Sequence, residues 1–294
     1  MALRTGSFLQ QLLPLSFVLL WSTGFIGARY GLPYAEPLTF LAIRVVIVLS
    51  LMTLIVLVCR APWPQSPAAG MHIAVTGVLV HGGYLPGVFV AIDRGLPSGL
   101  AALVVGLQPI ATALFAGLLL NEAVGRRQWL GLALGLAGVV MVLSGKLWQD
   151  ALSAQTLWYL VWPTLMALAS ITAGTLYQKR FVPVFDLRTG SILQFLPCLG
   201  LFGALALTTE TRQVDWSGDF IFALLWLSLV LSIGAITLLN RLLRQGSAVQ
   251  VASLFYLTPP VTAVMAWLLF DEVLAPLAVV GMAVTVAGVW LARR

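Results

Sequence analysis

Two stretches of the chain decide its fold: QPIATALFAGLLLNE at residues 108–122 and TPPVTAVMAWLLFDE at residues 258–272. The second begins 150 residues after the first (258 against 108), and each pairs an early proline with an acidic ending. The same offset aligns the two halves without a gap. The matched positions include Gly24/Gly174, Arg29/Lys179, Pro33/Pro183, Thr39/Thr189, Arg94/Arg244, Gly131/Gly281 and Gly138/Gly288. The chain is therefore predicted to contain one unit twice, as residues 1–148 and 149–294.

The composition places both units in a lipid bilayer. Apolar residues make up 60% of the 294 residues and charged residues only 9%, whereas a soluble domain is about a quarter charged. A helix of about 20 apolar residues crosses the roughly 30 Å of hydrocarbon. Apolar stretches bounded by charges, Pro or Gly predict ten such spans, near residues 10–31, 37–58, 70–92, 96–120, 127–144, 156–179, 187–208, 217–239, 247–269 and 274–292.

The number of spans sets the relation between the two units. Because five is odd, the second unit enters the membrane from the opposite side. The sequence thus predicts an all-α integral membrane protein with ten transmembrane helices, arranged as two inverted five-helix repeats (5+5) around a central cavity. Inverted repeats of this kind are typical of transporters that work by alternating access.

The positive charges predict the orientation and exclude other classes of protein. Eleven Lys and Arg fall on the side of the predicted N-terminus and four on the other side, so both termini are expected in the cytoplasm of a bacterium, with the chain in its inner membrane. There is no basic block for nucleic acid, no phosphate-binding loop and no cluster with metal-ligand spacing. We therefore expect no nucleic-acid partner, no cofactor, no metal and no enzymatic activity.

Several motifs also resemble a known family. The stretch Trp21-Ser22-Thr23-Gly24-Phe25, the stretch Phe40-Leu41-Ala42-Ile43-Arg44, and the two Pro…acidic endings in this order are similar to the EamA-type branch of the drug/metabolite transporter (DMT) superfamily. Within that branch, the chain is most similar to bacterial exporters of aromatic and neutral amino acids of the YddG type. The resemblance implies amino-acid export, with spans five and ten as peripheral scaffolding.

Ionisable groups inside the spans are the first candidates for a substrate site, because their burial in hydrocarbon is costly. Arg44 is expected roughly 10 Å below the span end at 1.5 Å per residue, and it could bind a substrate carboxylate. Alternatively it snorkels to the surface or holds helix-end carbonyls. His81 could contact substrate, shuttle a proton or serve as a packing histidine.

Polar and aromatic positions complete the predicted cavity. Gln108 and Thr112 share a helix face, as do their repeat mates Thr258 and Thr262. These four either line the cavity or bond neighbouring helices. The remaining candidates are Trp21, Ser22, Tyr84 and Tyr256 for the cavity wall, and Pro109, Pro259 and Pro260 as helix breaks that free backbone carbonyls.

The charge inventory narrows the substrate. A dianionic substrate is disfavoured, because a single interior arginine cannot offset the cost of removing two negative charges from water. A lipophilic cation is also disfavoured, because span one lacks the carboxylate on which small drug exporters with a similar repeat rely. A small neutral or zwitterionic solute is therefore predicted, most specifically an aromatic or other neutral amino acid. The alternatives are a metabolite or drug exporter of the same superfamily, and an intramembrane enzyme or lipid-handling protein. Proton coupling, facilitated diffusion and oligomeric state stay open.

Overall fold

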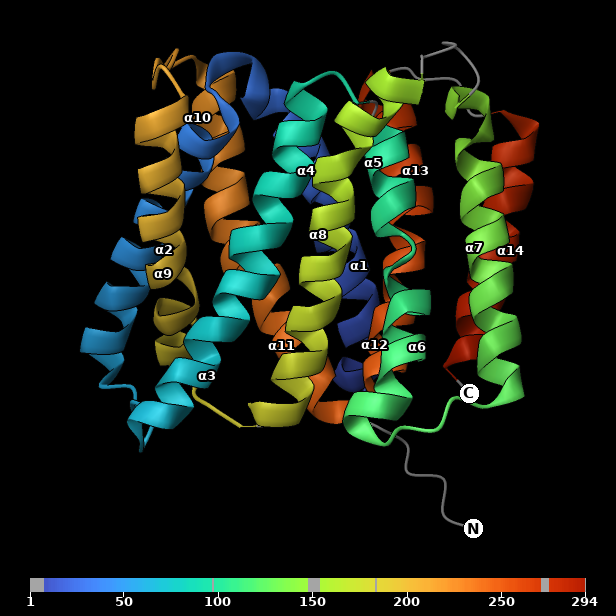
Figure 1. Cartoon of the computed structure of the whole chain (residues 1–294), viewed down its shortest axis with the longest axis horizontal. Coiled ribbons are helices and arrows are strands. Elements are labelled where there is room, and N and C mark those ends of the chain that lie inside the picture. Colours follow the sequence, from blue (N-terminus) through green and yellow to red (C-terminus); the bar gives the residue numbers. More distant parts are fainter. Residues whose placement is uncertain (1–7, 97, 148–153, 183, 271–274, 294) are drawn as a thin grey trace.

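A computed structural model describes residues 8–96, 98–147, 154–182, 184–270 and 275–293 as a bundle of long helices (Figure 1). Within these residues, the only strand pairing is one isolated bridge between Ala35 and Val214. Several positions named above lie outside the described residues. They are Pro183, Asp271, Glu272 and the unit boundary at 148/149. Two of the eleven basic residues counted for the orientation, Arg4 and Arg294, also lie outside them.

The helical elements follow the predicted spans closely. In chain order they are α1 (Phe8–Gly31), η1 (Leu32–Tyr34), α2 (Pro37–Cys59), α3 (Pro67–Gly77), η2 (Val78–Gly83), α4 (Tyr84–Asp93), α5 (Ser98–Val105), α6 (Gln108–Leu120), α7 (Arg126–Leu147), α8 (Ala154–Phe181), α9 (Leu187–Thr209), α10 (Gly218–Leu225), η3 (Trp226–Ala235), α11 (Ile236–Gln245), α12 (Ala248–Ala252), η4 (Ser253–Leu257), α13 (Thr258–Phe270) and α14 (Pro276–Ala292). Among the described residues, eight helical segments are long and apolar enough to cross a membrane. The helix α14 is a shorter apolar helix.

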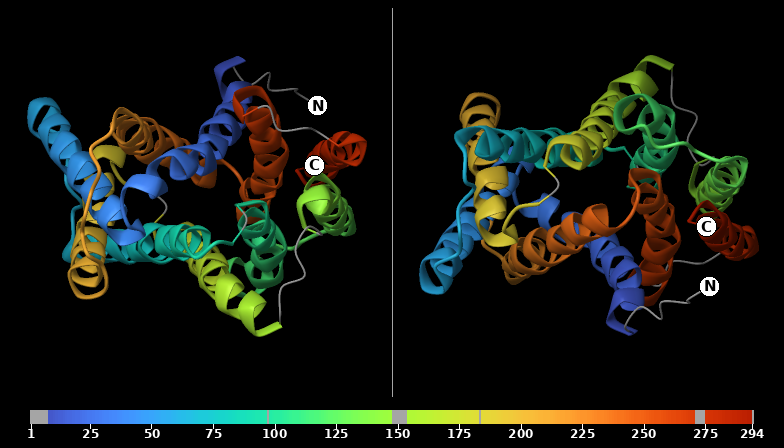
Figure 2. Two further views of the ribbon diagram at one scale, coloured as in Figure 1. Left: turned by 90° about the horizontal axis from the view of Figure 1, so that it is seen from above. Right: turned by 90° about the horizontal axis from the view of Figure 1, so that it is seen from below.

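The helices form two rows between two end pairs (Figure 2). One row holds α10–α11, α1 and α12–α13, and the other holds α3–α4, α8 and α5–α6. The pair α2–α9 closes one end of the rows and the pair α7–α14 lies at the other end. Each row thus combines one helix of one repeat unit with two spans of the other unit. The end of the bundle where α1 begins and α14 ends is called the lower end here, as in Figure 1.

Short polar side chains fix where several helices begin and end. Ser217 accepts the backbone N–H of Phe220 at the start of α10, which satisfies one of the free donors of a helix N-terminus. Asn121 ends α6 with a left-handed backbone (φ 54°), a conformation that Asn tolerates. Glu122 then accepts the N–H of Ala248 at 3.0 Å and caps α12 of the other unit. The Asn-Glu ending in the sequence is therefore a helix stop followed by a cap.

Glycines bring α7 and α14 to backbone contact. A Cβ on Gly138 would lie 2.6 Å from the carbonyl oxygen of Gly281, and one on Gly288 would lie 2.4 Å from the backbone nitrogen of Gly135. Small residues at this spacing permit close contact between helices. Against α8, a Cβ on Gly87 would likewise lie 2.4 Å from the carbonyl oxygen of Pro163, whereas one on Gly83 would meet the side chain of Ser170.

The third span of each unit contains a π-helical segment at the same place in the repeat. The segment η2 covers residues 78–83 and the segment η3 covers residues 226–235. Pro86 lacks the N–H that would bond the carbonyl of Gly82, which favours the wider turn in η2. In η3 the hydroxyl of Ser232 donates to the carbonyl of Leu227, five residues earlier, at 3.0 Å. Both segments face the centre of the bundle.

Candidate functional site

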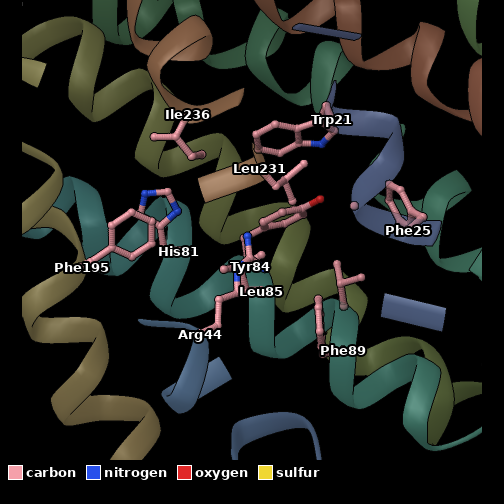
Figure 3. Close-up of a pocket in the computed structure, with 12 residues that line it drawn as sticks. Trp21, Phe25, Arg44, His81, Tyr84, Leu85, Phe89, Phe195, Leu231 and Ile236 are labelled. Carbon is pink, nitrogen blue, oxygen red and sulfur yellow. The ribbon is translucent and has the colours of Figure 1, made fainter. Parts of the chain in front are cut away.

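A cavity of about 40 Å³ lies inside the bundle near the α2–α9 end (Figure 3). Four residues predicted from the sequence line it: Trp21, Arg44, His81 and Tyr84. The rest of the lining was not predicted and is apolar, namely Gly24, Phe25, Leu85, Val88, Phe89, Phe195, Leu231 and Ile236. One water needs about 10–15 Å³ of such space. The cavity therefore holds a few waters, and a larger solute requires the two rows to move apart.

Arg44 places a positive charge in this cavity. Its side chain is only 3% exposed, and its Nε donates to the hydroxyl of Ser232 at 3.0 Å. Its Nη1 is buried and has no hydrogen-bond partner among the described residues. The side chain thus points inward and does not snorkel. A buried guanidinium with a free donor is suited to an anionic group such as a carboxylate.

His81 lies beside Arg44 and presents an apolar face. Its ring stacks on Phe195, with ring centroids 4.4 Å apart and an interplanar angle of 12°. The ring is buried, and its Nε2 has no partner in the described part of the chain. This histidine therefore combines a packing contact with an unused polar atom.

Aromatic rings form the side of the cavity opposite His81. Trp21 of α1 stacks with Tyr84 of α4 at 6.0 Å between centroids, and this contact joins the two rows. Trp21 also meets Phe255 edge-on at 5.1 Å, and Phe17 packs against both. Rings packed in this way offer apolar faces and give the wall a defined shape.

The repeat offset links the cavity residues in pairs. The mate of Arg44 is Gln194, whose Oε1 is also buried without a partner among the described residues, and the mate of His81 is Leu231. Phe195 follows Gln194, and Leu231 precedes Ser232. Two of the unpredicted lining residues, Phe195 and Leu231, were thus marked by the repeat positions of Arg44 and His81.

The polar face on α1 and α13 lies outside the lining of this cavity. Ser22 is fully buried and donates to the carbonyl of Val18 at 2.7 Å and to that of Thr258 at 3.4 Å. Thr262 donates to the carbonyl of Ser22 at 3.4 Å. These hydroxyls join α1 to α13. Bonding between helices was one of the two alternatives for Thr262, whereas Ser22 was predicted in the cavity wall.

The remaining predicted residues also lie outside the cavity lining. Gln108 and Thr112 are fully buried on α6, and Tyr256 packs its ring against Gly135 of α7. The polar atoms of Gln108, Thr112 and Tyr256 are buried and have no hydrogen-bond partner among the described residues, so these side chains neither line this cavity nor bond a neighbouring helix. Pro109, Pro259 and Pro260 lie in the first turns of α6 and α13, where α5 and η4 end. None of these three prolines lines the cavity.

Polar side chains tie the two rows together at the lower end. Gln178 of α8 donates through Nε2 to Oδ1 of Asn240 on α11 at 2.7 Å, and both side chains are buried. Next to this pair, the ammonium of Lys179 donates to the carbonyls of Leu243 and Gly246 at 2.8 and 2.6 Å. The repeat mates of Gln178 and Asn240 at the upper end are Ala28 and Val90, which cannot form such a bond.

Two carboxylates join the repeat units at the upper end. Glu210 accepts the N–H groups of Leu38 and Thr39, each at 2.7 Å, and so caps α2. Glu36 accepts the N–H groups of Thr211 and Arg212 at 2.7 and 2.9 Å. The hydroxyl of Thr211, with the two backbone donors, holds the pKa of Glu36 below its ordinary value of 4.5.

These features define a class of protein. The apolar helices make the chain a multi-pass membrane protein, and the cavity between them, with one buried charge, is a candidate site for a small solute. In the described part of the chain, no group of three or more His, Cys, Asp or Glu could hold a metal ion. The fold and the cavity are those of a transporter.

Comparison with known proteins identifies the family. Residues 10–144 and residues 158–294 each match the profile of the EamA-like transporter family. The chain belongs to this family, within the drug/metabolite transporter superfamily.

Several relatives match nearly the whole chain. A protein of Salmonella typhimurium named "Probable amino-acid metabolite efflux pump" is 28% identical over 95% of this chain and 93% of its own length. The Escherichia coli K12 protein of the same name is 26% identical with the same coverage. The "Uncharacterized inner membrane transporter YedA" of that strain is 27% identical, covering 96% and 91%. A solved crystal structure has the same fold, with a TM-score of 0.78, 20% identity and coverage of 96% and 95%.

Proposed function

We propose that this transporter exports neutral and zwitterionic amino acids, with a preference for aromatic ones. The observation that carries the proposal is Arg44, a buried cation with a free donor in a cavity walled by aromatic rings. Two relatives named as probable amino-acid metabolite efflux pumps support the same substrate class. An amino acid offers the matching chemistry, because it joins a carboxylate to an apolar side chain.

The proposed binding mode follows from the lining. The substrate carboxylate pairs with the guanidinium of Arg44, and the substrate side chain lies against Trp21, Tyr84 and Phe195. His81 contributes its free Nε2 as a second polar contact. A substrate with two negative charges is disfavoured, because Arg44 is the only cationic side chain in the cavity lining of the described structure.

The proposed mechanism is alternating access by two inverted five-helix units, residues 1–148 and 149–294. The two successive matches to one family profile and the matched π-helical segments support this arrangement. The excess of Lys and Arg at the lower end supports a cytoplasmic location for that end and for both termini. Thiol-specific labelling of single cysteines at positions 65 and 213 from each side of the membrane tests it, since the two positions should label from opposite sides.

Transport by the purified protein in proteoliposomes tests the substrate. Uptake of radiolabelled Phe, Met and Thr above that of empty liposomes is expected, and a panel of dyes tests the drug-exporter alternative. Loss of one charge-assisted pair costs about 1.5–3 kcal/mol, so Arg44→Gln should raise the half-saturating substrate concentration about 10- to 150-fold. Arg44→Lys should recover part of this loss.

A matched control separates the loss of the substrate contact from the loss of a positive charge elsewhere on the protein. Arg127→Gln removes an exposed charge at the lower end and should transport normally. Absence of flux for every neutral amino acid, in protein that is folded, would rule out the proposed substrate class. Normal half-saturation in Arg44→Gln would instead show that this arginine has a structural role.

A further inference from the structure

A second, larger cavity lies at the lower end of the bundle, away from the central one. It measures about 550 Å³ and is bounded by the last turns of α2, the first turns of α9 and the span η3–α11. Its lining has two parts. One part is basic, with Arg188, Arg241 and Arg244, and the other is apolar, with Met52, Ile55 and Ile233.

The basic part of the lining carries more positive charge than its acidic neighbour neutralises. Asp186 binds Arg188 through two bonds, at 3.0 and 2.7 Å, and neutralises it. Arg244 donates to the carbonyl of Phe185 and lies over that ring at 4.6 Å, while its Nε has no partner among the described residues. Arg241 is exposed and forms no ion pair or hydrogen bond within the described part of the chain. Two positive charges at this cavity are therefore not neutralised.

The two parts of the lining lie at different depths. Arg241 and Arg244 belong to the last turn and a half of the span that ends at Gln245, so their charges lie at the membrane boundary. Ile233 is eight residues before Arg241, about 12 Å deeper at 1.5 Å per residue. The cavity therefore runs from a cationic rim to an apolar interior, which is the polarity profile of one leaflet.

A general excess of positive charge at one membrane face does not account for this cavity. The repeat offset gives each rim position a counterpart at the upper end, and the mates of Arg188 and Arg241 are Leu38 and Ala91. Only Arg244 keeps a basic mate, Arg94. The repeat therefore does not reproduce the cationic rim at the upper end, and the rim is specific to the lower end.

We propose that this cavity binds one anionic glycerophospholipid of the lower leaflet. Its phosphate group pairs with Arg241 and Arg244, and an acyl chain lies along Met52, Ile55 and Ile233. Basic pockets between membrane helices recognise lipid headgroups by the same chemistry. The site is independent of the central cavity and of the substrate proposed for it.

Thermal unfolding of the purified full-length protein in detergent tests the site. Dioctanoyl phosphatidylglycerol should raise the melting temperature in a saturable way, whereas dioctanoyl phosphatidylcholine should not. Each basic residue near an anionic headgroup contributes about 1 kcal/mol, so Arg241→Gln with Arg244→Gln should weaken the apparent affinity about 30-fold. The double variant Arg126→Gln with Arg127→Gln removes the same charge from exposed positions at the lower end and should bind normally.

Two further arms separate the lipid from simpler anions and from misfolding. Glycerol phosphate carries the charge without the chain and should give no shift at the same concentration. Thr237→Trp fills the groove and keeps every arginine, so it should also abolish the phosphatidylglycerol effect. The proposal is overturned if glycerol phosphate gives the full shift, or if phosphatidylcholine equals phosphatidylglycerol. It is also overturned if the Arg241/Arg244 variant, with a normal melting temperature in detergent alone, keeps the wild-type response.

Discussion

The amide pair of Gln178 and Asn240 allows a direct test of how the lower end closes. The two side chains are 3% and 2% exposed and share one hydrogen bond of 2.7 Å across the rows. Gln178→Leu leaves the amide of Asn240 buried without this partner, whereas water would satisfy that amide once the lower end opens. A stranded neutral group costs about 1–3 kcal/mol, so the single change should shift the equilibrium toward the open lower end by about 5- to 150-fold.

The double variant should not shift this equilibrium toward the open lower end. With Gln178→Leu and Asn240→Leu together, no polar group is stranded, and two apolar side chains of similar size meet across the rows. Such a replacement is close to neutral or stabilising for the buried state. The double variant should therefore be at least as closed at the lower end as the parent protein, although each single variant is more open.

Labelling of a cavity cysteine measures this equilibrium. Leu85 lines the central cavity, and Leu85→Cys can be studied in a background with Cys59→Ser and Cys198→Ala. A membrane-impermeant maleimide is applied to inside-out and right-side-out vesicles. Its labelling rate from the side of the lower end should rise in both single variants and return to the parent value in the double variant.

The control is an amide at the same end but outside the rows. Gln128 accepts the N–H of Gly125 at 3.1 Å in an exposed turn, so Gln128→Leu should leave the labelling rate unchanged. Equal rates in the parent, both single variants and the double variant would refute the closing role of the pair. A double variant that opens more than either single variant would refute the energetic reasoning.

Three further predictions concern stability. Folding lowers the pKa of Glu36, so its ionised carboxylate stabilises the folded protein above pH 4.5, its ordinary pKa, and this stabilisation is lost as the pH falls through the lower pKa of the folded state. The difference in melting temperature between wild type and Glu36→Gln should therefore stay constant from pH 8 to about 5.5 and shrink below about 4.5. Gly138→Ala should lower stability by about 1–3 kcal/mol in thermal unfolding, because its Cβ would lie 2.6 Å from a carbonyl of α14, whereas Gly200→Ala, with nothing within 4 Å, should not. Ser232→Ala strands the Nε of Arg44 and should cost about 1–3 kcal/mol, and wild-type stability in the same melt would contradict that contact.

The strongest predictions from the sequence concerned features that are rare in hydrocarbon. Apolar runs bounded by Pro, Gly and charges located the ends of the long helical segments to within three residues, except that the segment predicted to end at residue 239 continues to Gln245. Arg44 and His81 were identified because an ionisable side chain inside an apolar span is unusual, and both line the cavity. Trp21 and Tyr84 were predicted from their depth beside these polar residues, and they line it too.

The buried polar residues outside the cavity could not be distinguished from cavity residues in the same way. Gln108 and Thr112 share a helix face, but the sequence does not indicate whether that face meets a cavity or another helix, because its apolar neighbours suit both. Ser22 and Thr262 turned out to bond α1 to α13. The pair of Gln178 and Asn240 was missed, because the two residues lie 62 positions apart and neither has a polar mate in the repeat.

Divergence between the copies also limits what the repeat can predict about motion. Gly77 lets α3 approach α9 so closely that a Cβ would lie 2.1 Å from the carbonyl oxygen of Gln194. Its mate is Leu227, which packs instead on Gly27 of α1, where a Cβ would lie 2.7 Å from Leu227 Cδ2. If the two units exchanged their conformations during transport, Leu227 would have to reach the backbone of α2, and its side chain prevents that approach. Under the proposed alternating-access mechanism, we therefore expect the opposite state to keep η3 farther from α2 than α3 is from α9 here, so that it is no exact mirror of this one.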